Sequence, residues 1–225
     1  MDFYTAVVGF FQTGGPFMYP IAFILTIGLA ISLERWMFLT SARIGNKRAF
    51  DKMAPFIQHR KYDQLKQFTQ KSAAPVSKIV GAGLASMSYS KRRDDVVSAM
   101  QEAAMESVPR LEKRTAYLAT LANVATLLGL LGTIIGLIAA FTAVADADPA
   151  QKATLLSQSI SVAMNTTAFG LISAIPLLLI HAMLQSKTTQ IVDSLDVVAV
   201  KFVNSVSARG DIQTQSRKDD IKAAA

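Results

Sequence analysis

Residues 115–145 read TAYLATLANVATLLGLLGTIIGLIAAFTAVA and contain no aspartate, glutamate, lysine or arginine. Residues 3–33 and 153–186 lack these four residue types as well. Each stretch is longer than the roughly 20 apolar residues that a helix needs to cross the hydrocarbon core of a bilayer. The sequence therefore predicts an all-helical membrane protein with three transmembrane helices.

The composition of the whole chain agrees with this fold class and argues against an enzyme. Of the 225 residues, 51% are hydrophobic and 17% are charged, and no cysteine is present to form a disulfide or a thiolate metal site. The sequence contains no phosphate-binding loop, nucleophile elbow or HExxH stretch. We therefore expect no catalytic residue, no metal and no cofactor. The net charge of +7 is not accompanied by a zinc module or a basic region with heptads, so we expect no nucleic-acid partner.

The basic residues are concentrated between the first two predicted spans and indicate the orientation. Residues 34–114 contain 16 lysines and arginines against 8 aspartates and glutamates. Since positively charged loops stay in the cytoplasm, we expect the N-terminus outside and the C-terminus inside, with Glu34 and Arg35 at the cytoplasmic membrane boundary. The predicted parts are an N-terminal segment with the first transmembrane helix (1–40), a cytoplasmic helical domain (41–114), the second transmembrane helix (115–145), a short periplasmic loop (146–158), the third transmembrane helix (159–186), and a cytoplasmic helix extension with a tail (187–225).

Helix boundaries outside the spans are predicted from glycine, proline and apolar periodicity. Turns are expected at 45–46, at Pro55 and at 74–75. The helical pattern between residues 94 and 144 is almost unbroken, so it predicts one long rod with a bend near Pro109.

Small and hydroxyl-bearing residues follow one face of each of the last two spans. In both spans they recur at intervals of three or four residues, which places them on one side of a helix. One interpretation is close helix packing alone. The other is that the hydroxyls line a polar pathway, because lipid offers them no partner. The residues predicted to line the pathway are Thr126, Gly129, Thr133, Gly136, Asn165, Thr166, Thr167 and Gly170. Those predicted to form helix interfaces are Gly132, Ala163, Ser173, Ala174 and Pro176.

The predicted pathway lacks a group that could carry a proton. No acidic residue, lysine or arginine lies deep in a span, and His181 is expected near the cytoplasmic boundary, about 21 Å of helix rise beyond Thr167. Proton relays inside membranes usually depend on such groups. If the chain conducts protons, the titrating carboxylate must therefore come from another polypeptide.

Two segments resemble the MotA/TolQ/ExbB proton channel family, and the ExbB/TolQ branch most closely. They are LLGLLGTIIGLI at 127–138 and TTAFGLISAIP at 166–176, with Glu34-Arg35 at the end of the first span. The resemblance implies a multi-pass protein of the bacterial inner membrane that works as the ion-channel subunit of a motor. Such a motor converts the proton motive force into mechanical work for TonB-dependent or Tol-type processes.

The resemblance also implies partners and site residues. It implies a homopentamer in membrane lipid around two copies of a single-span ExbD/TolR-like protein, which supplies a transmembrane aspartate, and a TonB/TolA-like energy-transducing protein. Thr133 and Thr167 match the pore threonines of the family. Thr126 stands where the family commonly has proline, and Val162 where a glutamate is frequent. The choice between proton and sodium is therefore left open.

Two other functions are compatible with the same residues. A stator subunit of a flagellar or gliding motor belongs to the same physical class, although flagellar stators usually have four spans and this chain is predicted to have three. A membrane scaffold without conduction would use the small faces for helix assembly alone.

Overall fold

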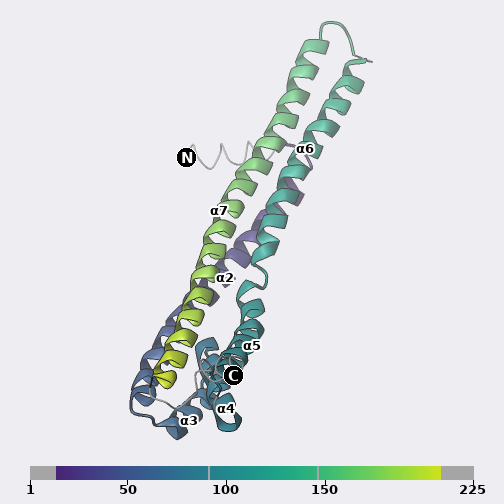
Figure 1. The fold of residues 1–225 in the computed structure, drawn as a ribbon. Coiled ribbons are helices and arrows are strands. Elements are labelled where there is room, and N and C mark those ends of the chain that lie inside the picture. The colour runs from purple at the N-terminus through teal and green to yellow at the C-terminus, as the bar shows by residue number, and fades with distance from the viewer. Residues whose placement is uncertain (1–13, 91, 146, 209–225) are drawn as a thin grey trace, which may run out of the picture. The chain divides into compact units, whose positions relative to one another are not determined.

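The computed structural model describes residues 14–90, 92–145 and 147–208, and within these ranges the chain is helical with no β-strand (Figure 1). The parts of the predicted N-terminal segment and C-terminal tail at 1–13 and 209–225 lie outside the described residues. The helices are α2 (Met18–Gln58), α3 (Tyr62–Lys71), α4 (Pro75–Tyr89), α5 (Arg93–Glu112), α6 (Thr115–Ala145) and α7 (Lys152–Ser207).

Three stretches of helix are long and apolar enough to cross a membrane. They lie in Met18–Gln58, Arg93–Ala145 and Lys152–Ser207. This finding confirms the predicted fold class. The orientation of the termini stays a prediction.

The chain divides into two compact units. The first, here called the transmembrane unit, comprises residues up to 35 together with 114–184. The second, here called the helical unit, comprises residues 36–113 together with those from 185 onward. Helices α2 and α7 each contribute one part to either unit.

In the transmembrane unit, α6 and α7 run side by side and contact each other through glycines (Figure 1). A Cβ placed on Gly170 would lie 2.9 Å from the carbonyl oxygen of Ala125 and 3.0 Å from Cα of Gly129. Leu177 of α7 fills the space beside Gly28 of α2, where an added Cβ would lie 2.6 Å from Cδ2 of the leucine. Small residues therefore let the three helices of this unit approach closely.

The core of the helical unit is built from apolar side chains on α2 to α5 and the end of α7. Gly83 of α4 packs against two of them, since an added Cβ would lie 2.7 Å from Cγ of Met100 and 3.2 Å from the ring of Phe202. The largest fully buried side chains of this unit include Leu39, Met53, Leu65, Ile79, Met100, Leu111 and Phe202.

The structure corrects two of the predicted turns. Helix α2 continues through Gly45 and Pro55 to Gln58, whereas the turn at 74–75 is confirmed as the start of α4. A glycine in a helix costs about 1 kcal/mol relative to alanine. Buried residues of α2 beyond Gly45, including Ala49 and Met53, pack into the helical unit and outweigh this cost.

The predicted rod from 94 to 144 is also corrected. The helix passes through Pro109 and ends instead at Glu112, and α6 begins at Thr115. Arg114 adopts a left-handed backbone conformation with φ of 67°, which breaks the helix. Residues 152–158, expected in a loop, form the first turns of α7.

Candidate functional site

Two threonines of α7 use their hydroxyls to fasten neighbouring segments of the transmembrane unit. The hydroxyl of Thr167 donates to the carbonyl oxygen of Gly129 on α6, at 2.8 Å. The hydroxyl of Thr166 lies 2.5 Å from the carbonyl oxygen of Gly14 and 2.9 Å from that of Val162. Because glycine has no side chain, its backbone is accessible to a hydroxyl from the next helix. The two threonines therefore stabilise the arrangement of α6, α7 and the segment before α2.

The threonines of α6 are engaged differently. Thr133 donates to the carbonyl oxygen of Leu130 at 2.6 Å, and Thr126 donates to that of Ala122 at 3.1 Å. Both hydroxyl hydrogens are thus used within the helix, and the oxygen lone pairs remain available as acceptors. Both side chains are only partly buried. Since the two residues are seven positions apart, they lie on the same side of α6.

The small residues predicted as site and interface positions meet in the contact between α6 and α7. Gly132 contacts the side chain of Thr166, and a Cβ on Gly136 would lie 2.9 Å from Cβ of Ala163. The contact runs antiparallel, because the partners on α7 have lower numbers as those on α6 rise. The buried residues along it are Ala122, Ala125, Gly129, Gly132 and Ala140 on α6 and Ala163, Thr166, Gly170, Ser173 and Ala174 on α7.

The remaining predicted positions lie outside this buried line. Thr133 and Thr126 flank it and are partly exposed, as are Thr167 and Asn165 on α7, whereas Gly136 is partly exposed but lies in the contact, against Ala163. Pro176 is exposed and does not interrupt α7. Within one chain, Gly129 and Gly170 thus allow close packing. The hydroxyl oxygen of Thr133 lies beside the contact, on a partly exposed side chain. Their place on an ion pathway stays a prediction.

Asn123 and Ser173 are polar groups in the spans that were not singled out from the sequence as carriers of function. Asn123 is exposed on α6, nine residues or about 13 Å of rise beyond Arg114. It lies on the outer surface with Leu127 and Leu130, and an amide is costly in lipid. Ser173, predicted only as an interface residue, has a buried hydroxyl with no hydrogen-bond partner among the described residues. A scan for any amide in a charge-free window would have found Asn123.

The end of the first span is tied to the start of α6 by an ion pair. Nη1 of Arg114 lies 3.4 Å from Oε2 of Glu34, and both side chains are about half exposed. Arg35 is buried, with 3% of its surface exposed. In the helical unit, Nζ of Lys187 lies 3.1 Å above the centre of the Trp36 ring. Charges and an amphipathic ring at this point are typical of a membrane–water interface.

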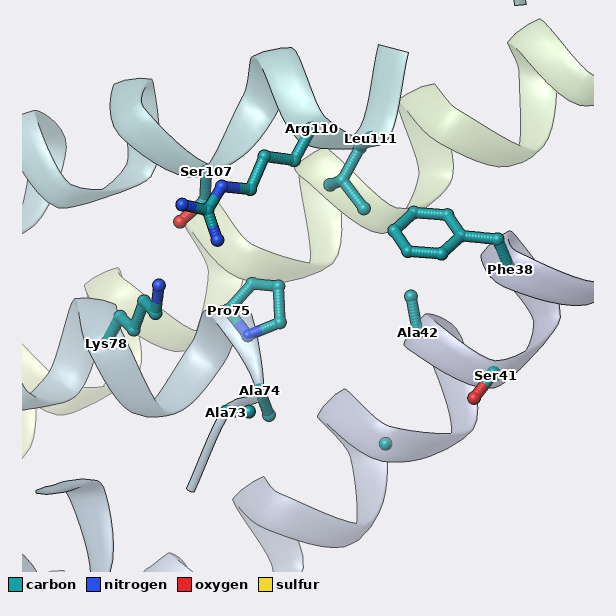
Figure 2. Close-up of a pocket in the computed structure, with 11 residues that line it drawn as sticks. Phe38, Ser41, Ala42, Ala73, Ala74, Pro75, Lys78, Ser107, Arg110 and Leu111 are labelled. Atoms are coloured by element: carbon teal, nitrogen blue, oxygen red, sulfur yellow. The ribbon is translucent and has the colours of Figure 1, made fainter. Parts of the chain in front are cut away.

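Each unit also holds a cavity. In the transmembrane unit, Gly14, Phe17, Gly132 and Thr166 contribute to the lining of a cavity of about 260 Å³. In the helical unit, α2, α4 and α5 enclose a pocket of about 320 Å³ (Figure 2). Within the described part of the chain, no three histidines, cysteines, aspartates or glutamates gather where they could hold a metal ion.

Charge-free spans, a glycine-mediated contact and hydroxyls at that contact define an integral membrane protein with polar groups inside the bilayer. Residues 71–197, more than half of the chain, match the MotA/TolQ/ExbB proton channel family. The chain belongs to this family. The match extends over both segments on which the resemblance was based.

Two curated proteins support the ExbB/TolQ branch. A protein of Methanothermobacter thermautotrophicus, named as a biopolymer transport protein ExbB homolog, is 28% identical over 227 aligned residues, which cover all of this chain and 78% of the relative. The Tol-Pal system protein TolQ of Haemophilus influenzae is 36% identical over 95 residues, which cover 41% of this chain and 40% of TolQ.

Proposed function

We propose that this chain is the ion-channel subunit of an inner-membrane motor that converts the proton motive force into mechanical work for TonB-dependent or Tol-type processes. In this proposal five copies surround the single transmembrane helices of two ExbD/TolR-like subunits. The aspartate of those helices carries the proton, and a TonB/TolA-like protein receives the work. The helical unit faces the cytoplasm.

The arrangement of hydroxyls in spans that lack carboxylates carries this proposal. Thr133 lies beside the α6–α7 contact with its hydroxyl partly exposed. The hydroxyl of Thr167 joins the two helices by its hydrogen bond to the carbonyl oxygen of Gly129. Residues 115–145 and 153–186 contain no acidic residue. A surface that carries hydroxyl groups and no titratable group is consistent with a second subunit that supplies the carboxylic acid.

The test replaces the hydroxyls by groups of the same shape. Thr133→Val and Thr167→Val are compared with Thr142→Val, which removes an equivalent bond on α6, from Thr142 to the carbonyl oxygen of Ile138 at 2.9 Å. Proton flux is measured in vesicles that contain the complex with its single-span partner, in sodium-free and in sodium-containing buffer. We expect at least a tenfold loss for the first two variants, equivalent to about 1.4 kcal/mol on the barrier.

Two further variants separate a role in conduction from a role in packing. Thr133→Ser and Thr167→Ser restore the hydroxyl and should recover most of the flux. Full flux in both valine variants with normal assembly would refute the proposal and favour a scaffold without conduction. Flux that requires sodium would retain the channel and change its ion.

A further inference from the structure

The pocket of the helical unit has a cationic end and an apolar end. Lys78 of α4 and Arg110 of α5 extend toward each other on one side, and Phe38 and Leu111 meet on the other (Figure 2). No acidic residue is among those that line it. A pocket with two such ends suits an amphiphile with an anionic head.

The two cations have no counter-ion within the described part of the chain. Arg114 is paired with Glu34, whereas neither Lys78 nor Arg110 takes part in an ion pair among these residues. Both side chains are exposed, so water screens their repulsion, and a phosphate that contacts both gains from two cations at once. Arginine and lysine are also the side chains that bind phosphate groups in proteins.

The apolar end is made by residues next to the spans in the sequence. Phe38 follows the charge-free first span by five residues, and Leu111 precedes the second charge-free stretch by four. Phe38 has 40% of its surface exposed, while Leu111 is buried. Trp36 and Lys187 stack in the same unit, in an arrangement typical of the level of the lipid head groups.

We propose that this pocket binds an anionic phospholipid of the adjoining leaflet, with the phosphate between Lys78 and Arg110 and the first methylenes of an acyl chain against Phe38 and Leu111. A volume of about 320 Å³ is at the lower end of ligand pockets, which span about 300–1,000 Å³. It holds a head group and the start of one chain, and the rest of the lipid stays in the bilayer. The lipid would fasten α2, α4 and α5 to the membrane surface.

The first test measures phosphatidylglycerol retained by the full-length protein in native mass spectrometry, from detergent micelles doped with this lipid or with phosphatidylcholine. The variant Lys78→Gln/Arg110→Gln is compared with Lys66→Gln/Lys113→Gln, which removes two exposed charges of the same unit outside the pocket. We expect phosphatidylglycerol to bind about 30-fold more weakly to the pocket variant, roughly fivefold for each cation, and near normally to the control. Equal losses in both variants would overturn the proposal.

A second variant blocks the pocket without removing charge. Gly45 contributes to the lining, and an added Cβ meets no atom within 4 Å. Gly45→Leu adds a large side chain at this wall, and the helix gains a better helix former than glycine. Loss of phosphatidylglycerol with an unchanged or higher melting temperature supports the proposal. Retention of the lipid contradicts it.

A third comparison identifies the source of the anion. Phe38→Ala removes an apolar wall and leaves both cations in place, so it should weaken phosphatidylglycerol binding and leave any binding of inorganic phosphate unchanged. If inorganic phosphate displaces the lipid and protects the protein equally well, the pocket is a site for free phosphate and the proposal fails. It also fails if an acidic peptide of a companion protein is retained there in place of lipid.

Discussion

We expect the largest loss of stability from a substitution at Gly170, because backbone atoms surround this glycine. In Gly170→Ala the new methyl group would lie 2.9 Å from the carbonyl oxygen of Ala125 and 3.0 Å from Cα of Gly129. Ordinary contacts between carbon atoms are about 3.5–4.0 Å. Neither neighbour can rotate away as a flexible side chain could. The two helices must therefore separate by about 0.5–1 Å at this level.

This separation also breaks the bond between the helices. The hydroxyl of Thr167 lies 2.8 Å from the carbonyl oxygen of Gly129, and an added 0.5–1 Å, as estimated above, takes it beyond useful hydrogen-bond length. Overpacking costs about 1–3 kcal/mol and the lost hydrogen bond about 0.5–1.5 kcal/mol. We expect Gly170→Ala to lower the free energy of unfolding by about 2–4 kcal/mol.

Reversible unfolding in mixed micelles measures this change, with two further glycines as references. Gly129→Ala is less crowded, with its nearest contact at 3.2 Å from Cα of Gly170, so about 1–2 kcal/mol is expected. Gly45→Ala enters open space and should stabilise the protein by about 0.5–1 kcal/mol. The reasoning would be refuted if Gly170→Ala were as stable as the parent, or if the order of the three variants were reversed.

Two other contacts allow predictions of smaller effects. Oδ1 of the buried Asn46 accepts a hydrogen bond from the backbone N–H of Val76 in the first turn of α4, at 3.3 Å. Asn46→Ala should therefore lower the free energy of unfolding by about 1 kcal/mol in thermal melts. The control Asn204→Ala, at an exposed residue, should change it by less than about 0.5 kcal/mol. Equal effects of the two substitutions would show that Asn46 does not cap α4. A double-mutant cycle with Glu34→Gln and Arg114→Gln should give a coupling energy of about 0.2–1 kcal/mol at low salt, because both side chains are about half exposed. This coupling energy should fall as salt screens the charges. A coupling energy that does not change with salt would contradict an ionic origin.

The spans could be predicted from the sequence because the membrane imposes a simple rule. The charge-free stretch at 115–145 has the same bounds as α6, Thr115–Ala145. Outside the spans that rule does not apply, and local signals compete with packing. Gly45 and Pro55 both favour a turn, yet α2 continues because its buried face packs into the helical unit.

The break before α6 could not have been found from composition. Pro109 is the residue that local rules mark as a helix breaker, but it lies inside α5. The chain breaks at Arg114 instead, where a left-handed conformation of a residue other than glycine is uncommon. Arg114 is also paired with Glu34, 80 positions earlier in the chain, a contact that no short window of sequence contains.

The buried line on α6 has another angular position than the line that the sequence pattern indicated. Intervals of three and four residues fit two neighbouring lines on a helix that share Ala122, Gly129, Gly136 and Ala140. The sequence pattern combined these with Thr126 and Thr133. In the structure the contact with α7 selects the line through Ala125 and Gly132, and the threonines flank it. Only the partner helix decides between the two lines.

The direction of the hydrogen bonds gives this difference a chemical meaning. Thr133 and Thr126 donate to their own helix, so each can offer a partner only the lone pairs of its oxygen. Such oxygens accept a hydrogen bond from a neutral carboxylic acid or interact with a cation, and they have no hydrogen left to offer a carboxylate. Under the proposed function, the wall of this subunit therefore favours the protonated form of the partner's aspartate over its ionised form. Valine has the shape of threonine and lacks these lone pairs, and for this reason Thr133→Val tests the wall directly.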